Sequence, residues 1–234
     1  VARKYDVDGI HLDYIRYPEK SIAFNDNATF KKYGKGLSAA QKAQWRRDNV
    51  TRCVRKITAK VKAVRPWIKM SCAPIGKHAD LRRYSAMGWS AMAMGQEAQR
   101  WLGEGLMDWL FPMMYFDGNH FYPFAADWQE NTPGDAAVVP GLGIWFLDSR
   151  ERNWALTDIT RQLAVCRALG LGGAAFFRAK FLDSNVKGLF DYLKNDFYTA
   201  PALTPAIKAP ADCPPPPPPV VKKQRQGKHL QLSW

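Results

Sequence analysis

The sequence predicts an α/β fold in which parallel β-strands alternate with α-helices. Five short apolar runs are each closed by turn residues such as Gly and Pro, as strands usually are. Helical patterns, with apolar residues three and four positions apart, separate these runs. The run at residues 108–116 is apolar at nearly every position, which is typical of a strand covered on both faces. Alternation of this kind produces a parallel sheet with right-handed crossovers.

The first predicted strand follows the turn signal at residues 8–9 and leads into a polar, aromatic loop. Side chains alternate along a strand, so His11 and Asp13 share one face while the apolar residues between them take the other. Parallel α/β enzymes build their sites where strands become loops. The polar and aromatic residues collected at this strand end are His11, Asp13, Tyr14, Arg16 and Tyr17. A strand end whose Asp merely caps a loop is the alternative.

A long loop at residues 19–37 precedes an amphipathic helix with Ser38 as its N-cap, ended by Arg65-Pro66. Further along, residues 117–122 are expected to form a polar-aromatic loop, and Thr157 to be an N-cap. The other expected strands are at residues 68–73, 108–116, 137–144 and 172–178, and the other expected helices at 96–106, 125–129, 157–169 and 185–198.

The end of the chain has a different composition. Residues 199–226 are predicted to be a Pro-rich linker, and its six consecutive prolines at 214–219 favour a stiff polyproline II spacer. Residues 227–234 alternate like a strand and resemble the first strand of a fibronectin-type-III-like sandwich, whose remainder would lie outside this sequence. A disordered tail is the alternative for this last segment.

Residues 5–18, YDVDGIHLDYIRYP, resemble the signature of the glycosyl-hydrolase-like ten family, also called domain of unknown function 187. Residues 45–50, 66–69 and 73–76 are also similar to that family. The resemblance implies a bacterial, exported, TIM-like (β/α)8 barrel, some of whose relatives cleave the glycan strands of peptidoglycan. It further implies that residues 1–198 carry barrel strands four to eight. Strands one to three would be missing, and the first strand here would present an unpaired edge.

This chain departs from the family's pattern at one strand. Relatives show Pro-Gln-x-Tyr-Trp where this chain has Met113 in place of Gln and Phe116 in place of Trp. If the Gln contacts sugar in relatives, this chain has lost a hydrogen bond and gained apolar surface there. The departure bears on the identity of the substrate.

Glycoside hydrolysis requires two carboxylates. Asp13 is the first candidate, because of its place at a strand end and because of the resemblance. Asp117 is the second candidate, and the alternative for it is a structural role in a loop turn before Gly118. Arg16 is expected to keep Asp13 ionised by lowering its pKa. Flat aromatic faces at strand ends suit sugar stacking, and Phe177 is a further ring of this kind, although each ring taken singly is more often part of a core. The predicted substrate-binding residues are His11, Tyr14, Arg16, Tyr17, Tyr115 and Trp145.

The resulting prediction is a glycoside hydrolase fragment, inactive alone, that acts on a bacterial cell-surface glycan, with peptidoglycan as the leading substrate. It would be a monomer, periplasmic or at the cell surface, as a secreted protein or a lipoprotein. No cofactor is expected, and the four cysteines lack the Cys-x-x-Cys spacing of zinc sites. The net charge of +13 is spread over helix faces without a nucleic-acid motif, so no nucleic-acid partner is expected.

Two other functions remain open at this point. One is a glycan-binding module without catalysis, which the departure at Met113 favours. The other is a metal-dependent barrel hydrolase, in which His11 and Asp13 would bind a divalent ion together with His78 or His120.

Overall fold

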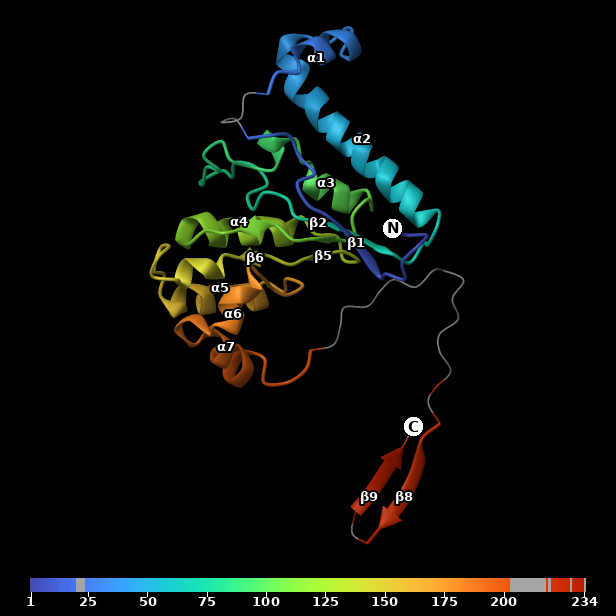
Figure 1. Ribbon diagram of the computed structural model, residues 1–234, viewed down its shortest axis with the longest axis vertical. Coiled ribbons are helices and arrows are strands. Elements are labelled where there is room, and N and C mark those ends of the chain that lie inside the picture. The colour runs from blue at the N-terminus through green and yellow to red at the C-terminus, as the bar shows by residue number, and fades with distance from the viewer. Residues whose placement is uncertain (20–23, 203–217, 219, 228, 234) are drawn as a thin grey trace.

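The computed structural model describes residues 1–19, 24–202, 218, 220–227 and 229–233 (Figure 1). Within these residues the predicted α/β architecture is confirmed, because parallel strands alternate with helices along the chain. Figure 1 shows the helices following one another in chain order along the strands, from α2 to α7. The arrangement is consistent with a partial TIM-barrel-like fold.

The parallel strands form two short sheets that continue one another. All pairs within them are parallel, and β1 lies at the edge of its sheet, as expected. The first sheet has the order β1 (Gly9–Leu12), β2 (Lys69–Cys72), β3 (Trp109–Leu110) and β5 (Ala137–Val138). The second has the order β4 (Met113–Met114), β6 (Gly141–Leu142) and β7 (Ala175–Phe176).

Two strands predicted as continuous are each divided in the structure. The run at 108–116 becomes β3 and β4 around Pro112, and the run at 137–144 becomes β5 and β6 around Pro140. A proline lacks the N–H that a ladder needs, so pairing is interrupted at each of these residues. A parallel bridge from Ile75 to Met113 extends the strand order from the first sheet to the second.

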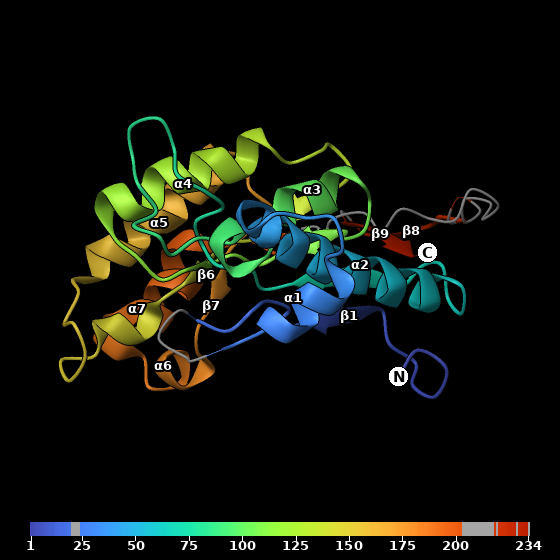
Figure 2. The ribbon, with the colours of Figure 1, turned by 90° about the horizontal axis from the view of Figure 1, so that it is seen from above.

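The helices pack on these strands through one continuous apolar core. Figures 1 and 2 both show the helices lying beside the strands. Helices α2, α3, α4 and α5 each bury at least one large side chain there, namely Val54, Trp101, Trp128 and Leu163. The helices are α1 (Asn27–Tyr33), α2 (Lys42–Lys62), α3 (Ala98–Gly103), α4 (Gly118–Glu130), α5 (Leu156–Ala168), α6 (Ala179–Asp183) and α7 (Leu189–Tyr192). Of the described helices, none combines the length and apolar character needed to span a bilayer.

The helix after β4 differs most from its prediction. Residues 118–122 are expected in a loop, but α4 begins at Gly118 with Asp117 at the N-cap position. Four apolar residues spaced for one helix face, Phe121, Phe124, Ala125 and Trp128, are all buried, and this packing offsets the presence of a proline inside the helix. The expected short helix at 125–129 is therefore only the second half of α4.

Three smaller differences concern helix ends. The loop at 19–37 contains α1, and Ser38 precedes a 3-10 turn at Ala39–Gln41 before α2 begins. Helix α5 begins after Ala155 rather than Thr157, because the Asp158 carboxylate accepts the Ala155 N–H at 2.9 Å. The closing helix expected at 185–198 begins only at Leu189, since Asn185 and Lys187 are left-handed, and α7 continues into a π-helical turn at Leu193–Phe197.

The C-terminal part of the described chain is a two-stranded antiparallel hairpin, β8 (Lys222–Gln226) and β9 (His229–Ser233). Strand β8 lies inside the range predicted as linker, so the predicted strand at 227–234 is the second strand of a pair. Most of the proline run at 214–219 lies outside the described residues.

Candidate functional site

A cavity of about 580 Å³ opens at the carboxyl ends of the parallel strands. Its volume lies within the range usual for small-molecule and sugar-sized sites, about 300–1,000 Å³. Each of the five strand runs predicted from the sequence contributes at least one lining residue. Barrel enzymes assemble their sites in this way. The lining residues are His11, Asp13, Tyr14, Ala73, Phe111, Met113, Tyr115, Gly141, Trp145, Ala175, Phe176 and Phe177.

Asp13 lies directly after β1, with its side chain exposed at the cavity. Its Oδ1 accepts a hydrogen bond from the backbone N–H of Tyr14 at 2.8 Å. Tyr14 itself has a φ of 52°, so the chain turns sharply at the point where the carboxylate is presented. Among the described residues that line the cavity, Asp13 is the sole carboxylate.

His11 lies one layer deeper on the same face of β1. Its Nδ1 is 2.9 Å from the Ser71 hydroxyl on β2, and its ring meets Phe111 edge-on with centroids 5.5 Å apart. Burial lowers the pKa of His11 below its usual value, and the nearby Asp13 charge offsets part of this shift. The imidazole is therefore mainly neutral at pH 7.

An aromatic wall, defined here as Tyr115, Trp145 and Phe177, faces this polar edge. The Tyr115 ring centroid lies 4.7 Å from that of Trp145 and 5.5 Å from that of Phe177, and the latter two are 5.4 Å apart. Burial raises the pKa of Tyr115 to about 12, with smaller contributions from Asp13 and Tyr14. The Tyr115 hydroxyl therefore keeps its proton and can donate a hydrogen bond to a ligand.

Arg16 and Tyr17 do not line the cavity. The Arg16 side chain is 5% exposed, and its charge partner is Glu19 at 3.2 Å rather than Asp13. The half-buried Tyr17 packs against Phe24, with ring centroids 5.7 Å apart, and its hydroxyl accepts a hydrogen bond from Asn49 at 3.4 Å. The side chains of Arg16 and Tyr17 thus help to hold the loop after β1 in place.

Asp117 also lies outside the cavity lining, although it follows β4 as predicted. It is exposed, and its backbone carbonyl accepts the N–H of His120 in the first turn of α4 at 3.0 Å. Acidic residues are favoured at this position because of the helix dipole. The structure therefore brings His11, Asp13, Tyr14, Tyr115 and Trp145 together at the cavity and leaves Asp117 apart from them.

Ser71 and Phe111 were not predicted at the site, whereas Phe177 was expected as a strand-end ring suited to sugar stacking. A signal for Ser71 exists in the strand pattern, because it occupies the position of β2 that pairs with His11. Phe111 is an apolar residue in an apolar run, so the sequence alone favours placing it in the core.

The histidines proposed as partners in a metal site do not join His11. The described part of the chain contains no group of three or more His, Cys, Asp or Glu side chains with metal-binding geometry. His78 packs against Trp128, and burial lowers its pKa to about 4. His120 Nδ1 lies 3.0 Å from Lys77 Nζ. The alternative of a metal-dependent hydrolase therefore finds no ligand set among these residues.

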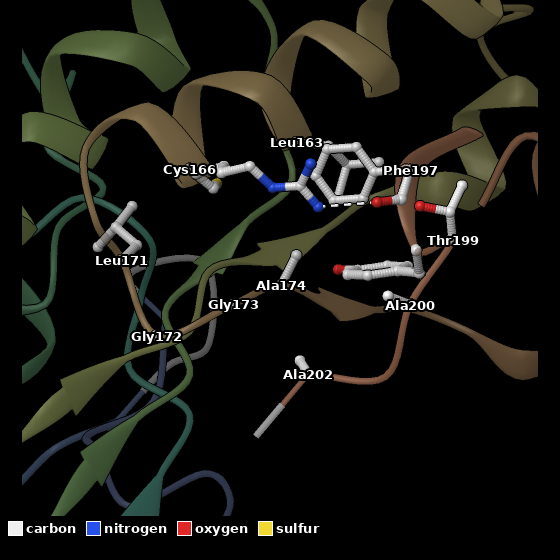
Figure 3. A pocket seen from close by; sticks show the side chains of 12 residues that line it. Leu163, Cys166, Leu171, Gly172, Gly173, Ala174, Phe197, Thr199, Ala200 and Ala202 are labelled. Carbon is white, nitrogen blue, oxygen red and sulfur yellow. Dashed lines mark hydrogen bonds between the residues drawn. The ribbon is translucent and has the colours of Figure 1, made fainter. Parts of the chain in front are cut away.

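A second hollow, of about 430 Å³, lies near the amino end of β7 (Figure 3). Leu163 and Cys166 of α5 form one side, and Phe197 and Thr199 form the other. Arg167 stacks on the Phe197 ring at 3.6 Å and donates a hydrogen bond to its carbonyl at 2.8 Å. The residues that line this hollow include no carboxylate and no histidine.

The family model of the glycosyl hydrolase-like 10 proteins matches residues 1–141. This chain belongs to the glycosyl hydrolase-like 10 family. The matched range contains β1 to β5 and most of the cavity, including Asp13 and Tyr115. The predicted family membership is thereby confirmed.

Two curated relatives carry the same description in their names. The chain is 28% identical over 230 residues to the glycosyl hydrolase YngK of Bacillus subtilis (strain 168), covering 88% of this chain and 44% of that protein. It is 25% identical over 203 residues to the glycosyl hydrolase DigH of Escherichia coli (strain K12), covering 78% of this chain and 46% of that protein. The chain thus spans less than half the length of these relatives.

Proposed function

We propose that this family member contributes barrel strands four to eight of a glycoside hydrolase that acts on a bacterial cell-surface glycan. The glycan strands of peptidoglycan are the leading substrate. The observation that supports this most strongly is the exposed Asp13 carboxylate facing an aromatic wall across a cavity of about 580 Å³. Carboxylates perform the chemistry of most glycosidases, and aromatic faces bind the apolar faces of sugar rings.

Asp13 would act directly on the glycosidic bond, as nucleophile, base or acid. Its side chain is exposed to a ligand in the cavity and is oriented by the N–H of Tyr14. Hydrolysis also requires a second carboxylate, roughly 5 Å away in retaining enzymes and 6.5–9.5 Å away in inverting ones. Asp117, the candidate predicted for that role, lies outside the cavity lining, so its substitution is expected to change activity far less than that of Asp13.

The remaining cavity residues would bind and orient the sugar. The Trp145 and Phe177 rings offer apolar faces, and the protonated Tyr115 hydroxyl offers a donor. Hydrogen bonding to Ser71 fixes the ring of His11, so its neutral imidazole would meet a sugar hydroxyl in a defined orientation. Tyr14 would contribute its exposed ring at the cavity edge.

The decisive experiment measures glycan release from peptide-stripped peptidoglycan by the full natural protein, with mass spectrometry of the products. We expect release by the wild-type protein and none by Asp13→Asn, with both variants equally folded. The new chain ends would identify the bond that is cleaved. Equal release by both proteins would remove Asp13 from the mechanism.

A non-catalytic glycan-binding module is the second candidate. The observation in its favour is that Asp13 stands without a second carboxylate on the described cavity lining. This function predicts that the wild-type protein retains insoluble peptidoglycan without releasing products. Loss of retention in Trp145→Ala, together with absent turnover in the wild type, would establish binding rather than hydrolysis.

Action on such a glycan requires the protein to reach the cell envelope. We therefore include export to the periplasm or cell surface, as a secreted protein or a lipoprotein, in the proposal. Cell fractionation of a native host with an antibody against the protein would test it. Recovery in the cytoplasmic fraction alone would contradict it.

A further inference from the structure

The turn that presents Asp13 contains a tyrosine in an unusual backbone conformation. Tyr14 has a φ of 52°, in the left-handed region that bulky residues rarely adopt. Tyr14 as a whole residue is 71% exposed, so packing in the core does not account for the conformation. The Tyr14 N–H is bonded to the Asp13 carboxylate, which couples the tyrosine backbone to the orientation of that carboxylate.

A buried guanidinium lies against the Tyr14 ring. The Arg16 guanidinium carbon is 4.7 Å from the Tyr14 ring centroid and 5.6 Å from that of Trp89, so the charge is within cation–π distance of two aromatic rings. The Arg16 N–H also donates to the Tyr14 carbonyl at 2.7 Å. Backbone and side chain of Arg16 therefore both hold Tyr14.

Arg16 is poorly satisfied for a residue so deeply buried. Its side chain is 5% exposed, it has one ion pair, to Glu19, and its Nε finds no hydrogen-bond acceptor among the described residues. Burying a charged group with an unpaired N–H is unfavourable for folding. The contact with the Tyr14 ring links the guanidinium to the conformation of Tyr14.

The chain on the other side of Arg16 is fixed to the body of the protein. The fully buried Gln96 accepts the N–H of Ile75 at 3.0 Å and donates to the carbonyl of Ile15 at 3.4 Å, which joins the segments after β1 and β2. The Tyr17 N–H donates to the Met94 carbonyl at 2.9 Å. The residues on both sides of Arg16 are thus held by hydrogen bonds to other segments, whereas Tyr14 is exposed.

We propose that Arg16 is a positioning residue: its guanidinium holds Tyr14 in the left-handed turn and so aims the Asp13 carboxylate into the cavity. This inference rests on the proposed function, because the aim of Asp13 matters through its reaction with glycan. It replaces two expected roles for Arg16. A side chain so little exposed is out of reach of a sugar, and its ion pair is made with Glu19.

The first test is structural and needs no activity. Crystal structures of wild type and Arg16→Met are compared, since methionine keeps much of the apolar stem but lacks the guanidinium. We expect Tyr14 to leave the left-handed region in the variant and the Asp13 carboxylate to turn from the cavity. Arg16→Lys provides a second variant if Arg16→Met does not fold, because it keeps the charge but not the planar stacking.

The second test is kinetic and uses the full natural protein. Misplacement of a reacting group lowers turnover rather than binding, so we expect kcat to fall by roughly 10–100-fold while KM changes less than about twofold. Arg46→Met is the matched control, because that arginine stacks on Tyr17 at 5.3 Å and pairs with Asp26 without contacting Tyr14. Its kcat should match that of the wild type.

A double-mutant cycle separates positioning from general destabilisation. Glycine adopts a positive φ without strain, so Tyr14→Gly removes the need for the guanidinium. Adding Arg16→Met to Tyr14→Gly should then lower kcat by less than about twofold. If the two substitutions instead lower kcat independently, so that their fold-changes multiply in the double variant, the proposal is overturned.

Other outcomes would also overturn it. A rise in KM with kcat unchanged would assign Arg16 to substrate binding, and an unchanged Tyr14 backbone in both Arg16 variants would remove its positioning role. Absence of turnover in the wild type would instead count against the proposed function, and the crystal structures would still decide how Arg16 acts.

Discussion

The ends of β1 and β4 carry two aspartates with the same predicted role and different surroundings. Asp13 borders a cavity, opposite an aromatic wall, on a turn held by a buried arginine. Asp117 is exposed at the start of a 13-residue helix and contributes nothing to the cavity lining. A carboxylate after a parallel strand is therefore not sufficient evidence for a site. The conformation of the next few residues, a tight turn or a helix, decides where the carboxylate points.

The two aspartates also differ in how well a structural role explains them. Negative charge at a helix N-terminus is stabilising, so Asp117 has a reason to be acidic that involves no substrate. Among the described residues, the Asp13 carboxylate accepts a hydrogen bond only from its own neighbour, in a turn with unfavourable backbone geometry. Strained segments of this kind are commonly found at functional sites. The comparison supports the proposed chemical role at the end of β1 and favours a folding role at the end of β4.

The largest effect is expected for Asp13→Asn. Asparagine keeps the shape of the side chain but can neither act as a base nor carry the negative charge. We expect kcat/KM on peptide-stripped glycan to fall by about 10²–10⁴-fold, as for other acid–base groups. Thermal unfolding by circular dichroism should be unchanged within error. A loss of activity that accompanies an equal loss of folded protein would weaken the comparison.

Helix α4 should instead respond to acid through His78, which packs on Trp128 of that helix. Burial lowers the His78 pKa to about 4, so the folded state resists protonation while the unfolded chain accepts a proton near pH 6.5. Stability from this residue is complete above pH 6.5 and is lost as the pH falls toward 4. The loss amounts to at most about 3 kcal/mol.

Urea unfolding of wild type and His78→Phe at several pH values measures this contribution. Phenylalanine cannot take up a proton, so the variant should lose less stability than the wild type between pH 6.5 and 4. Parallel pH curves for the two proteins would contradict the assignment. Activity at pH 7 should be similar in both, since His78 is not among the cavity residues.

A smaller effect is expected for Trp145→Ala in the aromatic wall. The indole contacts both Tyr115 and Phe177, so its removal takes away one stacking face and loosens the other two. We expect glycan affinity to weaken about tenfold, which corresponds to roughly 1.4 kcal/mol. Trp67→Ala, at an exposed indole before β2, is the matched control and should bind like the wild type. Equal weakening in both would point to a nonspecific effect.

The sequence predicted those features of the fold that depend on a few neighbouring residues better than those that depend on distant segments. The five strand runs and the placing of His11 and Asp13 at one cavity follow from periodicity over a few residues. Pro112 and Pro140 in the sequence indicate where strand pairing can be interrupted. The division into two sheets also depends on which strands lie next to one another. The polar start of α4 resembled a loop because its apolar residues gain their partners only in the folded core.

The site was predictable in its polar part and less so in its apolar part. Asp13 and His11 are conspicuous among apolar neighbours, whereas Phe111 resembles a core residue. The role of Arg16 depends on the burial of its side chain and on Trp89, which lies far along the sequence. Such contacts between distant segments cannot be obtained from spacing.

The smallest effect is expected for Asp117→Asn, which tests the other half of the comparison. Asparagine is also favoured at N-caps, so the variant loses only the interaction of a charge with the helix dipole, about 0.3–1 kcal/mol. The kcat/KM should equal that of the wild type, and urea unfolding should show the small loss of stability. A fall of kcat by about 100-fold or more, with folding intact, would make Asp117 the second carboxylate. It would also require α4 to begin differently when glycan is bound, since Gly118 already starts that helix here.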